Sequence, residues 1–205
     1  MDYNPKTIMT MKYFKIPLLF ALMAMFTACG SDDEPSGTPD DYRMGFITDY
    51  DVNLRVKVTD PDAAKDVATL TVRYYDEAGN MQKETVTGAE WNKNVKYTVG
   101  DNLKIGLCAE WTLRSQEEIQ AAPKTAYDLG VDITSLYTGT RTNGDKVEST
   151  FFSKQNVGIN GGAKNKETLI DLKESGKRLY SSFLFIYKKL STGGIYAEES
   201  NFPAE

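Results

Sequence analysis

The chain has 205 residues and a formal net charge of −5, and it contains two cysteines and no histidine. The acidic balance argues against nucleic acid and anionic membrane surfaces as partners. The lack of histidine excludes a Ser-His-Asp or Cys-His site, and zinc is disfavoured because there is no cysteine cluster either. We therefore expect no enzyme, no catalytic residues, no metal and no cofactor; glycoside hydrolysis, which needs only two carboxylates, is unsupported rather than excluded.

A short apolar run lies near the start of the chain. Lys12 and Lys15 precede an apolar stretch at 16–28, which is shorter than the roughly 20 residues that a membrane-spanning helix needs. A basic start, a short apolar core and small residues before a cleavage point are typical of a secretory signal. We predict a signal peptide at 1–28, with Met11 as the natural start. A buried helix, or a plain secretory signal followed by a stray cysteine, is the alternative.

The end of this run has a recognisable pattern, Phe26, Thr27, Ala28 and Cys29. It resembles the lipobox of bacterial lipoproteins, although Phe26 stands where an aliphatic residue is usual. The resemblance implies that the Cys29 thiol takes a diacylglycerol and that the new amino terminus is acylated after cleavage. Two or more acyl chains anchor a protein stably, because each buried methylene contributes roughly 0.8 kcal/mol.

Acidic residues follow the cysteine at once: Ser31, Asp32, Asp33 and Glu34. They resemble the export signal of Bacteroidota surface lipoproteins, which implies an outer-membrane location facing the cell exterior. Residues 29–41 are also rich in Pro, Gly, Ser and Asp, so a plain flexible linker is the alternative. Residues 1–28 carry one Asp and three Lys, so cleavage would change the net charge from −5 to −7.

The rest of the chain, 42–205, is predicted to be one all-β domain. Apolar and polar residues alternate at 52–58, 70–74, 95–99 and, over the longest stretch, 103–113, which indicates half-buried antiparallel strands. Hairpin turns are predicted at 77–80, 100–102 and 143–145. The polar stretch 81–87 is expected to be an edge strand.

One helix is predicted at 115–122, because Ser115 and Glu118 have capping-box spacing and Pro123 ends the helix. Further strands are expected at 127–133, 147–152, 168–172 and 179–190. In the last of these, 183–187 is apolar on both faces, so this strand is expected to lie centrally. Many short strands with turns at this spacing predict an antiparallel β-sandwich.

Residues 71–111 contain, in order, a strand, an acidic-Gly-Asn turn, a polar strand, a Trp, an aromatic strand, a Gly-Asp turn and a long apolar strand. This order is similar to that of small anchored extracytoplasmic β-sandwich proteins, including mycobacterial small membrane proteins that accompany transporters and Bacteroidota lipoproteins. It covers about a fifth of the chain and has no chemical motif. It implies an immunoglobulin-like or transthyretin-like sandwich and no particular activity.

Two aromatic residues are candidate ligand-stacking positions. Trp91 lies between polar neighbours at a strand entrance, and Tyr75 is expected to point away from Tyr74 and to be exposed. Packing of Trp91 in the core or at its rim is the alternative. Trp111 lies on the apolar face of its strand and is predicted to be a core residue.

Two acidic patterns suggest calcium only weakly. Asp49, Asp51 and Asn53 match the opening of a calcium loop, but the required Gly is missing. The second group, Asp60, Asp62 and Asp66, surrounds Pro61, where acids are usually solvated caps of a turn. Cys108 is expected to be a buried, inert thiol.

The leading functional hypothesis is a surface binding or accessory module. Its partners would be the membrane, through covalent lipid, and a glycan, a small ligand or another envelope protein. The alternative is a structural component of fimbrial or adhesin assembly that uses an exposed strand edge.

Overall fold

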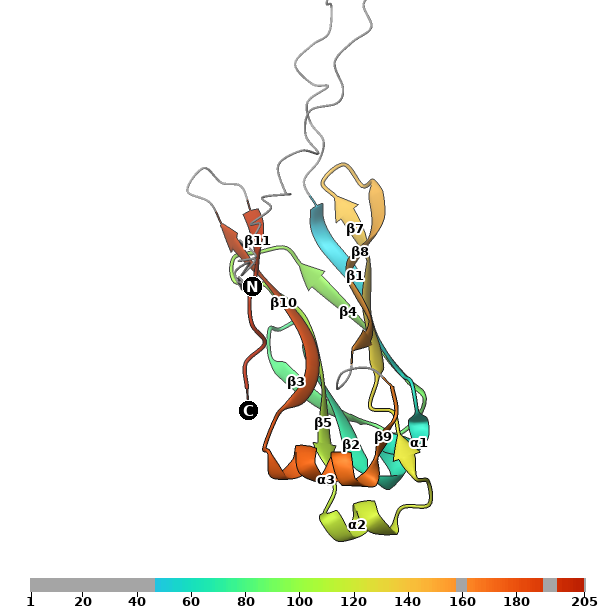
Figure 1. Cartoon of the computed structure of the whole chain (residues 1–205). Helices are drawn as coiled ribbons and strands as arrows, with labels where there is room; N and C mark the ends of the chain where they lie inside the picture. Colours follow the sequence, from blue (N-terminus) through green and yellow to red (C-terminus); the bar gives the residue numbers. More distant parts are fainter. Residues whose placement is uncertain (1–46, 158–161, 190–194, 205) are drawn as a thin grey trace, which may run out of the picture. The chain divides into compact units, whose positions relative to one another are not determined.

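The computed structural model describes residues 47–157, 162–189 and 195–204, so the predicted signal peptide, Cys29 and the linker lie outside the described residues. Two antiparallel sheets pack face to face (Figure 1). The four-stranded sheet has the order β4 (Glu90–Thr98), β1 (Ile47–Val58), β7 (Val131–Arg141), β8 (Lys146–Val157). The five-stranded sheet has the order β11 (Ile195–Glu199), β10 (Leu179–Lys189), β5 (Lys104–Leu113), β2 (Ala68–Tyr75), β3 (Met81–Val86). The predicted all-β sandwich is confirmed; its immunoglobulin-like or transthyretin-like type stays a prediction.

The core lies between the sheets and follows the period-two pattern of the strands. In β1 the alternate residues Val52, Leu54 and Val56 are fully buried, and in β5 Leu107 is as well. Each such side chain contributes about 1.5–3 kcal/mol when it leaves water. Trp111 is 5 % exposed and belongs to the same cluster, which confirms its predicted place in the core.

An aromatic group fills the core where β8 covers it. The pairing of β7 with β8 shifts between Ser135 and Leu136, so Phe151 is an extra residue in β8. Such a bulge lets two consecutive side chains point the same way. Phe152 stacks on Phe183 of β10 with ring centroids 4.8 Å apart, and Phe151 lies 4.2 Å from the ring of Tyr137.

Two of the three predicted hairpin turns are confirmed, those at 77–80 and 143–145. The hairpin predicted at 100–102 is wrong, because β4 and β5 on either side of this turn belong to different sheets, so the turn carries the chain from one sheet to the other. Asp76 closes the β2–β3 hairpin, because its Oδ1 accepts hydrogen bonds from the backbone N–H groups of Ala78 and Asn80. In the β7–β8 turn Gly144 has φ of +87°, a left-handed conformation that costs glycine little. The central position of β10 is also confirmed, since it pairs with β5 on one side and β11 on the other.

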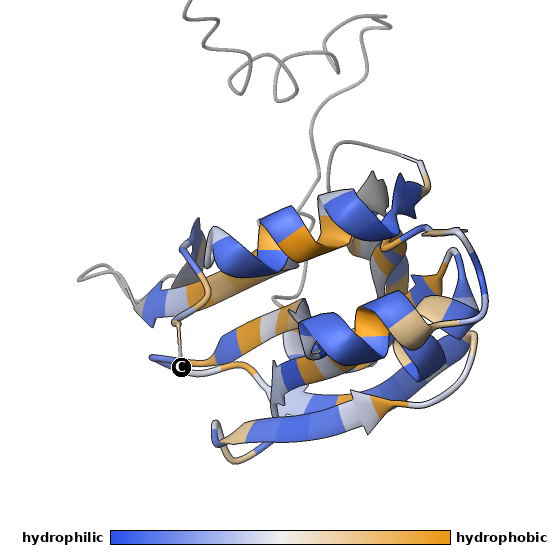
Figure 2. Ribbon diagram, turned by 60° about the horizontal axis from the view of Figure 1, so that its bottom comes forward, coloured by the Kyte–Doolittle hydropathy of each residue, from blue (hydrophilic) through white to orange (hydrophobic). Residues whose placement is uncertain are grey.

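Three short helices and a small β6 (Ala126–Tyr127)–β9 (Lys164–Asn165) ladder lie at one end of the sandwich (Figure 1). The helices are α1 (Pro61–Asp66), α2 (Gln116–Ala121) and α3 (Lys166–Glu174). Each shows a mainly hydrophilic ribbon with a few hydrophobic residues (Figure 2). The predicted capping box of α2 is present, with Ser115 and Glu118 bonded reciprocally.

Three further predictions of local structure were wrong. The stretch 168–172 is part of α3 rather than a strand, because the Asn165 side chain accepts from the N–H of Thr168 and caps a helix that buries Leu169. The expected turn at Asp60 begins α1, with Pro61 at its first position. The predicted strand 127–133 is split into β6 and β7, where the N–H of Gly130 donates to Asp128 Oδ1.

Candidate functional site on the four-stranded sheet

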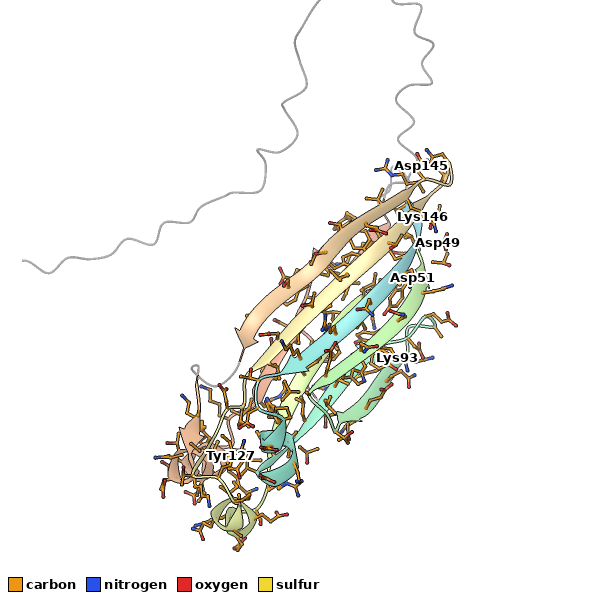
Figure 3. All side chains as sticks on the ribbon, turned by 90° about the vertical axis from the view of Figure 1, so that its right-hand side faces the viewer. Asp49, Asp51, Lys93, Tyr127, Asp145 and Lys146 are labelled. Atoms are coloured by element: carbon orange, nitrogen blue, oxygen red, sulfur yellow. The ribbon has the colours of Figure 1, made fainter. Side chains whose placement is uncertain are left out.

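The outer face of the four-stranded sheet carries a continuous polar surface. Because side chains alternate along a strand, the buried residues of β1 leave Asp49, Asp51 and Asn53 pointing outward. Asp49 and Lys146 lie toward one end of this face and Asp51 lies further along it (Figure 3). The sequence shows this alternation, but only the sheet register shows which polar residues of the other strands lie beside it.

In this register, each row across the sheet contains one residue from each of the four strands. The central row is Lys96, Asp51, Thr138 and Glu148, from β4, β1, β7 and β8. The row on one side is Thr98, Asp49, Thr140 and Lys146, and the row on the other is Asn94, Asn53, Leu136 and Thr150. Neighbouring strands lie about 4.8 Å apart and successive rows roughly 7 Å apart. The face is therefore a grid of carboxylates, amides, hydroxyls and ammonium groups.

Two shallow depressions lie over this grid. One has a volume of about 510 Å³ and is lined by residues that include Asn53, Asn94 and Leu136. The other has a volume of about 760 Å³. Both are lined by Asp51, Thr138 and Glu148, so the central row joins them into one continuous surface.

The charged groups of the central row are unengaged. Within the described part of the chain, the side chains of Asp51, Lys96 and Glu148 form no hydrogen bond or ion pair. By contrast, Asp49 accepts hydrogen bonds from the hydroxyls of Thr48 and Thr98. Exposed carboxylates and an ammonium without internal partners are available to a ligand from solvent.

The lining of the two depressions is acidic. It contains four carboxylates, Asp49, Asp51, Glu77 and Glu148, and two lysines, Lys96 and Lys146. The excess of carboxylates disfavours anionic ligands. Among the described residues no aromatic ring points outward from this sheet, and the apolar group on the face is Leu136, which is 45 % exposed. Recognition here would depend on hydrogen bonds rather than on stacking.

Trp91 lies on β4, an edge strand of the four-stranded sheet, and its side chain points toward β2 and β3. Its Nε1 donates to Glu84 Oε2 at 2.8 Å, and its ring lies 5.5 Å from that of Tyr74. Glu84 also accepts from the Tyr74 hydroxyl and from Lys93. The Trp91 N–H, followed by the Tyr74 hydroxyl, lowers the pKa of Glu84 below its ordinary value. Trp91 is thus a partly buried rim residue, separate from the polar face.

The expected exposure of Tyr75 is wrong, since the side chain is 5 % exposed. The Tyr75 ring packs 5.7 Å from that of Phe202, which lies on the outer face of the five-stranded sheet. The sequence pattern of β2 correctly predicts that Tyr75 points away from the core. It does not reveal that residues 127 positions later in the chain bury it.

The remaining candidates are the acidic residues considered for calcium binding and Cys108. Asp49, Asp51 and Asn53 lie along one strand face and do not wrap around a point as a calcium loop does. Asp60 caps α1 and, with Asp62, pairs with Lys124. Among the described residues no group of three or more potential metal ligands is found. Cys108 is buried as predicted, and burial raises the pKa of its thiol.

No family model, curated protein or solved structure matches the chain. In the described residues no helix is both long and apolar enough to cross a membrane.

Proposed function

We propose that this protein is a lipid-anchored outer-membrane protein of the cell surface that captures a polar ligand on the outer face of its four-stranded sheet. The observation that carries the proposal is the central row, in which Asp51, Thr138 and Glu148 line both depressions while their carboxylates have no internal partner. A row of free acceptors on a rigid sheet is pre-organised for hydrogen bonding.

The ligand chemistry that fits best is a neutral, polyhydroxylated chain such as an oligosaccharide. Carboxylates and the Asn53 and Asn94 amides can exchange several hydrogen bonds with hydroxyl groups. The excess of acidic groups disfavours uronic acids and other anionic sugars. Because no aromatic ring among the described residues points outward from this sheet, binding to one copy of the protein is expected to be weak. Many copies on one surface would raise the effective affinity for a long chain.

A binding experiment tests this directly. Isothermal titration with neutral gluco-, manno-, galacto- and xylo-oligosaccharides should give binding to at least one of them and none to oligogalacturonate. A variant with Asp51→Asn and Glu148→Gln should lose at least tenfold in affinity, whereas the matched change Glu117→Gln on exposed α2 should have no effect. Binding of the galacturonate, or equal binding by both variants, would contradict the proposed site.

The anchor is tested separately. The lipobox resemblance supports lipidation of Cys29, so Cys29→Ala should release the protein from the membrane fraction. The acids Asp32, Asp33 and Glu34 add only charge to a tether and cannot themselves hold a membrane. Replacing all three with Ala should leave the lipid and membrane pelleting intact but protect the protein from protease added to whole cells. Equal cleavage of both forms would leave the surface location unsupported.

Structural assembly is the second candidate. It has one favourable observation: β8 is a 12-residue strand that pairs only with β7 among the described strands. Against it, β8 contains register shifts and carries Lys146 and Lys154, features that oppose pairing with another strand. We therefore rank capture first. Native mass measurement distinguishes the two, since an assembly subunit would form large polymers.

A further inference from the structure

One row of the polar face, next to the central row, carries no charged side chain. It contains Asn94, Asn53, Leu136 and Thr150, from β4, β1, β7 and β8, and is called here the amide row. All four residues line the depression of about 510 Å³. The row on the other side of the central row, in contrast, carries a carboxylate and an ammonium group. The two ends of the polar face therefore differ in chemistry.

The two amides of this row hold each other in one orientation. Asn53 Nδ2 donates a hydrogen bond to Asn94 Oδ1 at 2.7 Å, across the β1–β4 pair. Among the described residues this is the only hydrogen bond that either side chain makes. Each side-chain amide has one acceptor oxygen and one donor NH₂ group. The pair therefore leaves Asn53 Oδ1 as a free acceptor and Asn94 Nδ2 as a free donor.

An apolar side chain lies next to this pair. Leu136 is the direct neighbour of Asn53 on β7, and its side chain is 45 % exposed. A single exposed leucine is common on protein surfaces. This one, however, lines a depression and lies one strand away from an amide with a free acceptor. The amide row thus presents, in order, a donor, an acceptor and an apolar surface.

This order matches that of the groups in an acetamido substituent. In its planar trans form the carbonyl points to one side, whereas the N–H and the methyl lie together on the other. The carbonyl can accept from Asn94 Nδ2, the N–H can donate to Asn53 Oδ1, and the methyl can pack on Leu136. A hydroxyl group can exchange hydrogen bonds with the two amides, but it has no methyl to cover Leu136.

We infer that the amide row selects a sugar that carries an N-acetyl group. This inference rests on the proposed function, because it names the class of sugar that the polar face binds. The ligand is a neutral saccharide in which an acetamido group replaces a hydroxyl. Asn53, Asn94 and Leu136 determine the specificity for that group, whereas Asp51 and Glu148 bind hydroxyl groups of acetylated and unacetylated sugars alike.

The probes are two matched pairs of sugars, titrated by NMR into the isotope-labelled protein. One pair is tri-N-acetylchitotriose and cellotriose, which share a backbone and differ in carrying acetamido or hydroxyl groups. The other pair is N-acetylgalactosamine and galactose. Wild type should bind the acetylated member of at least one pair about tenfold more tightly than its parent.

Two variants remove parts of the amide row. Asn94→Asp keeps an acceptor for Asn53 but removes the free donor, and Leu136→Ala removes the surface that the methyl covers. Each should reduce the acetyl preference about threefold. Asn92→Asp adds the same charge to the same strand at a residue that lines neither depression, so it should leave the preference unchanged. Met81→Ala, at a 42 % exposed position of β3, is the control for Leu136→Ala.

The double variant Asp51→Asn, Glu148→Gln separates this inference from the proposed function, because it should weaken both members of a pair by the same factor. Equal affinity of wild type for both members of each pair, with both weakened in the double variant, would overturn the inference and leave the proposed function in place. A preference that persists in full in Asn94→Asp and Leu136→Ala would also overturn it. Failure of both acetylated sugars to bind would overturn it as well, whatever the unacetylated panel shows.

Discussion

The two outer faces of this sandwich differ in every property that decides what a surface can bind. The face of the four-stranded sheet is open and acidic, and among the described residues its Asp51 and Glu148 side chains have no hydrogen-bond or ion-pair partner. The face of the five-stranded sheet is covered in part by Phe202, and on it Glu110 accepts hydrogen bonds from both Arg73 and Arg178. Substitutions on the first face should therefore change binding, and substitutions on the second should change stability.

The largest loss of stability is expected for a substitution in the core between the two sheets. Trp111→Ala should reduce the free energy of unfolding by about 3–5 kcal/mol, because a large buried ring is removed and leaves a cavity. Urea denaturation followed by circular dichroism measures this. Tyr180→Ala, at a 49 % exposed position on β10, is the control and should change little. An unchanged midpoint for Trp111→Ala would place the ring outside the core.

Arg73→Ala compared with Asp51→Ala tests the contrast between the faces themselves. Loss of Arg73 removes a buried partner of Glu110 and a contact of Phe202, and it should cost about 2–3 kcal/mol. This is below the usual cost of breaking a buried pair because Arg178 still neutralises Glu110. Asp51→Ala should cost less than about 0.5 kcal/mol. Similar losses in the free energy of unfolding for Arg73→Ala and Asp51→Ala would contradict the proposed difference between the two faces.

Two glycines, one in each sheet, differ in how much space surrounds them. A Cβ at Gly106 of β5 would lie 2.9 Å from the Phe183 carbonyl oxygen, which is backbone and cannot move away freely. Gly106→Ala should destabilise by about 1–3 kcal/mol. A Cβ at Gly139 of β7 would meet only the Ile47 side chain, at 3.0 Å, so Gly139→Ala should cost less. Thermal melts that rank the two variants the other way would contradict this account.

The smallest expected effect is a pH dependence located at Glu110. The hydrogen bond from Arg178 is the main cause that lowers the pKa of Glu110 below its ordinary value of 4.5. A carboxyl whose pKa is lower in the folded state adds stability above about pH 4.5 and loses that stability as the pH falls through the folded value. Wild type should therefore lose stability more steeply than Glu110→Gln below pH 4.5. Parallel curves would mean that Glu110 is not stabilised by its arginines.

Much of the sandwich was predictable because apolar and polar residues alternate over 52–58, 70–74, 95–99 and 103–113, within β1, β2, β4 and β5. The helix α3 was missed because its short run at 168–172 is apolar enough to suit a strand, and its cap at Asn165 gives only a local signal. Apolar residues on both faces of β10 indicated a central strand. No local pattern predicted that Phe202 packs over Leu184 on the outer face of this strand.

The polar face was harder to predict than the fold. Asp51 was noted for a possible calcium loop, whereas its importance comes from Lys96, Thr138 and Glu148 beside it. Those neighbours are set by strand register over separations of 45 to 97 positions, and sequence periodicity does not contain that information. Trp91 attracted attention as an aromatic residue, yet its N–H is engaged by Glu84.

Chemical-shift mapping by NMR tests the central claim most directly. Isotope-labelled protein would be titrated with the neutral oligosaccharide that binds best in the panel. Amide shifts should concentrate in the rows around Asp51, Thr138 and Glu148, and the amide shifts of residues around Arg73 on the opposite sheet should stay unchanged. Shifts that concentrate at Arg73 and Phe202, or at the rim around Trp91, would contradict the assignment of the open polar face as the binding surface.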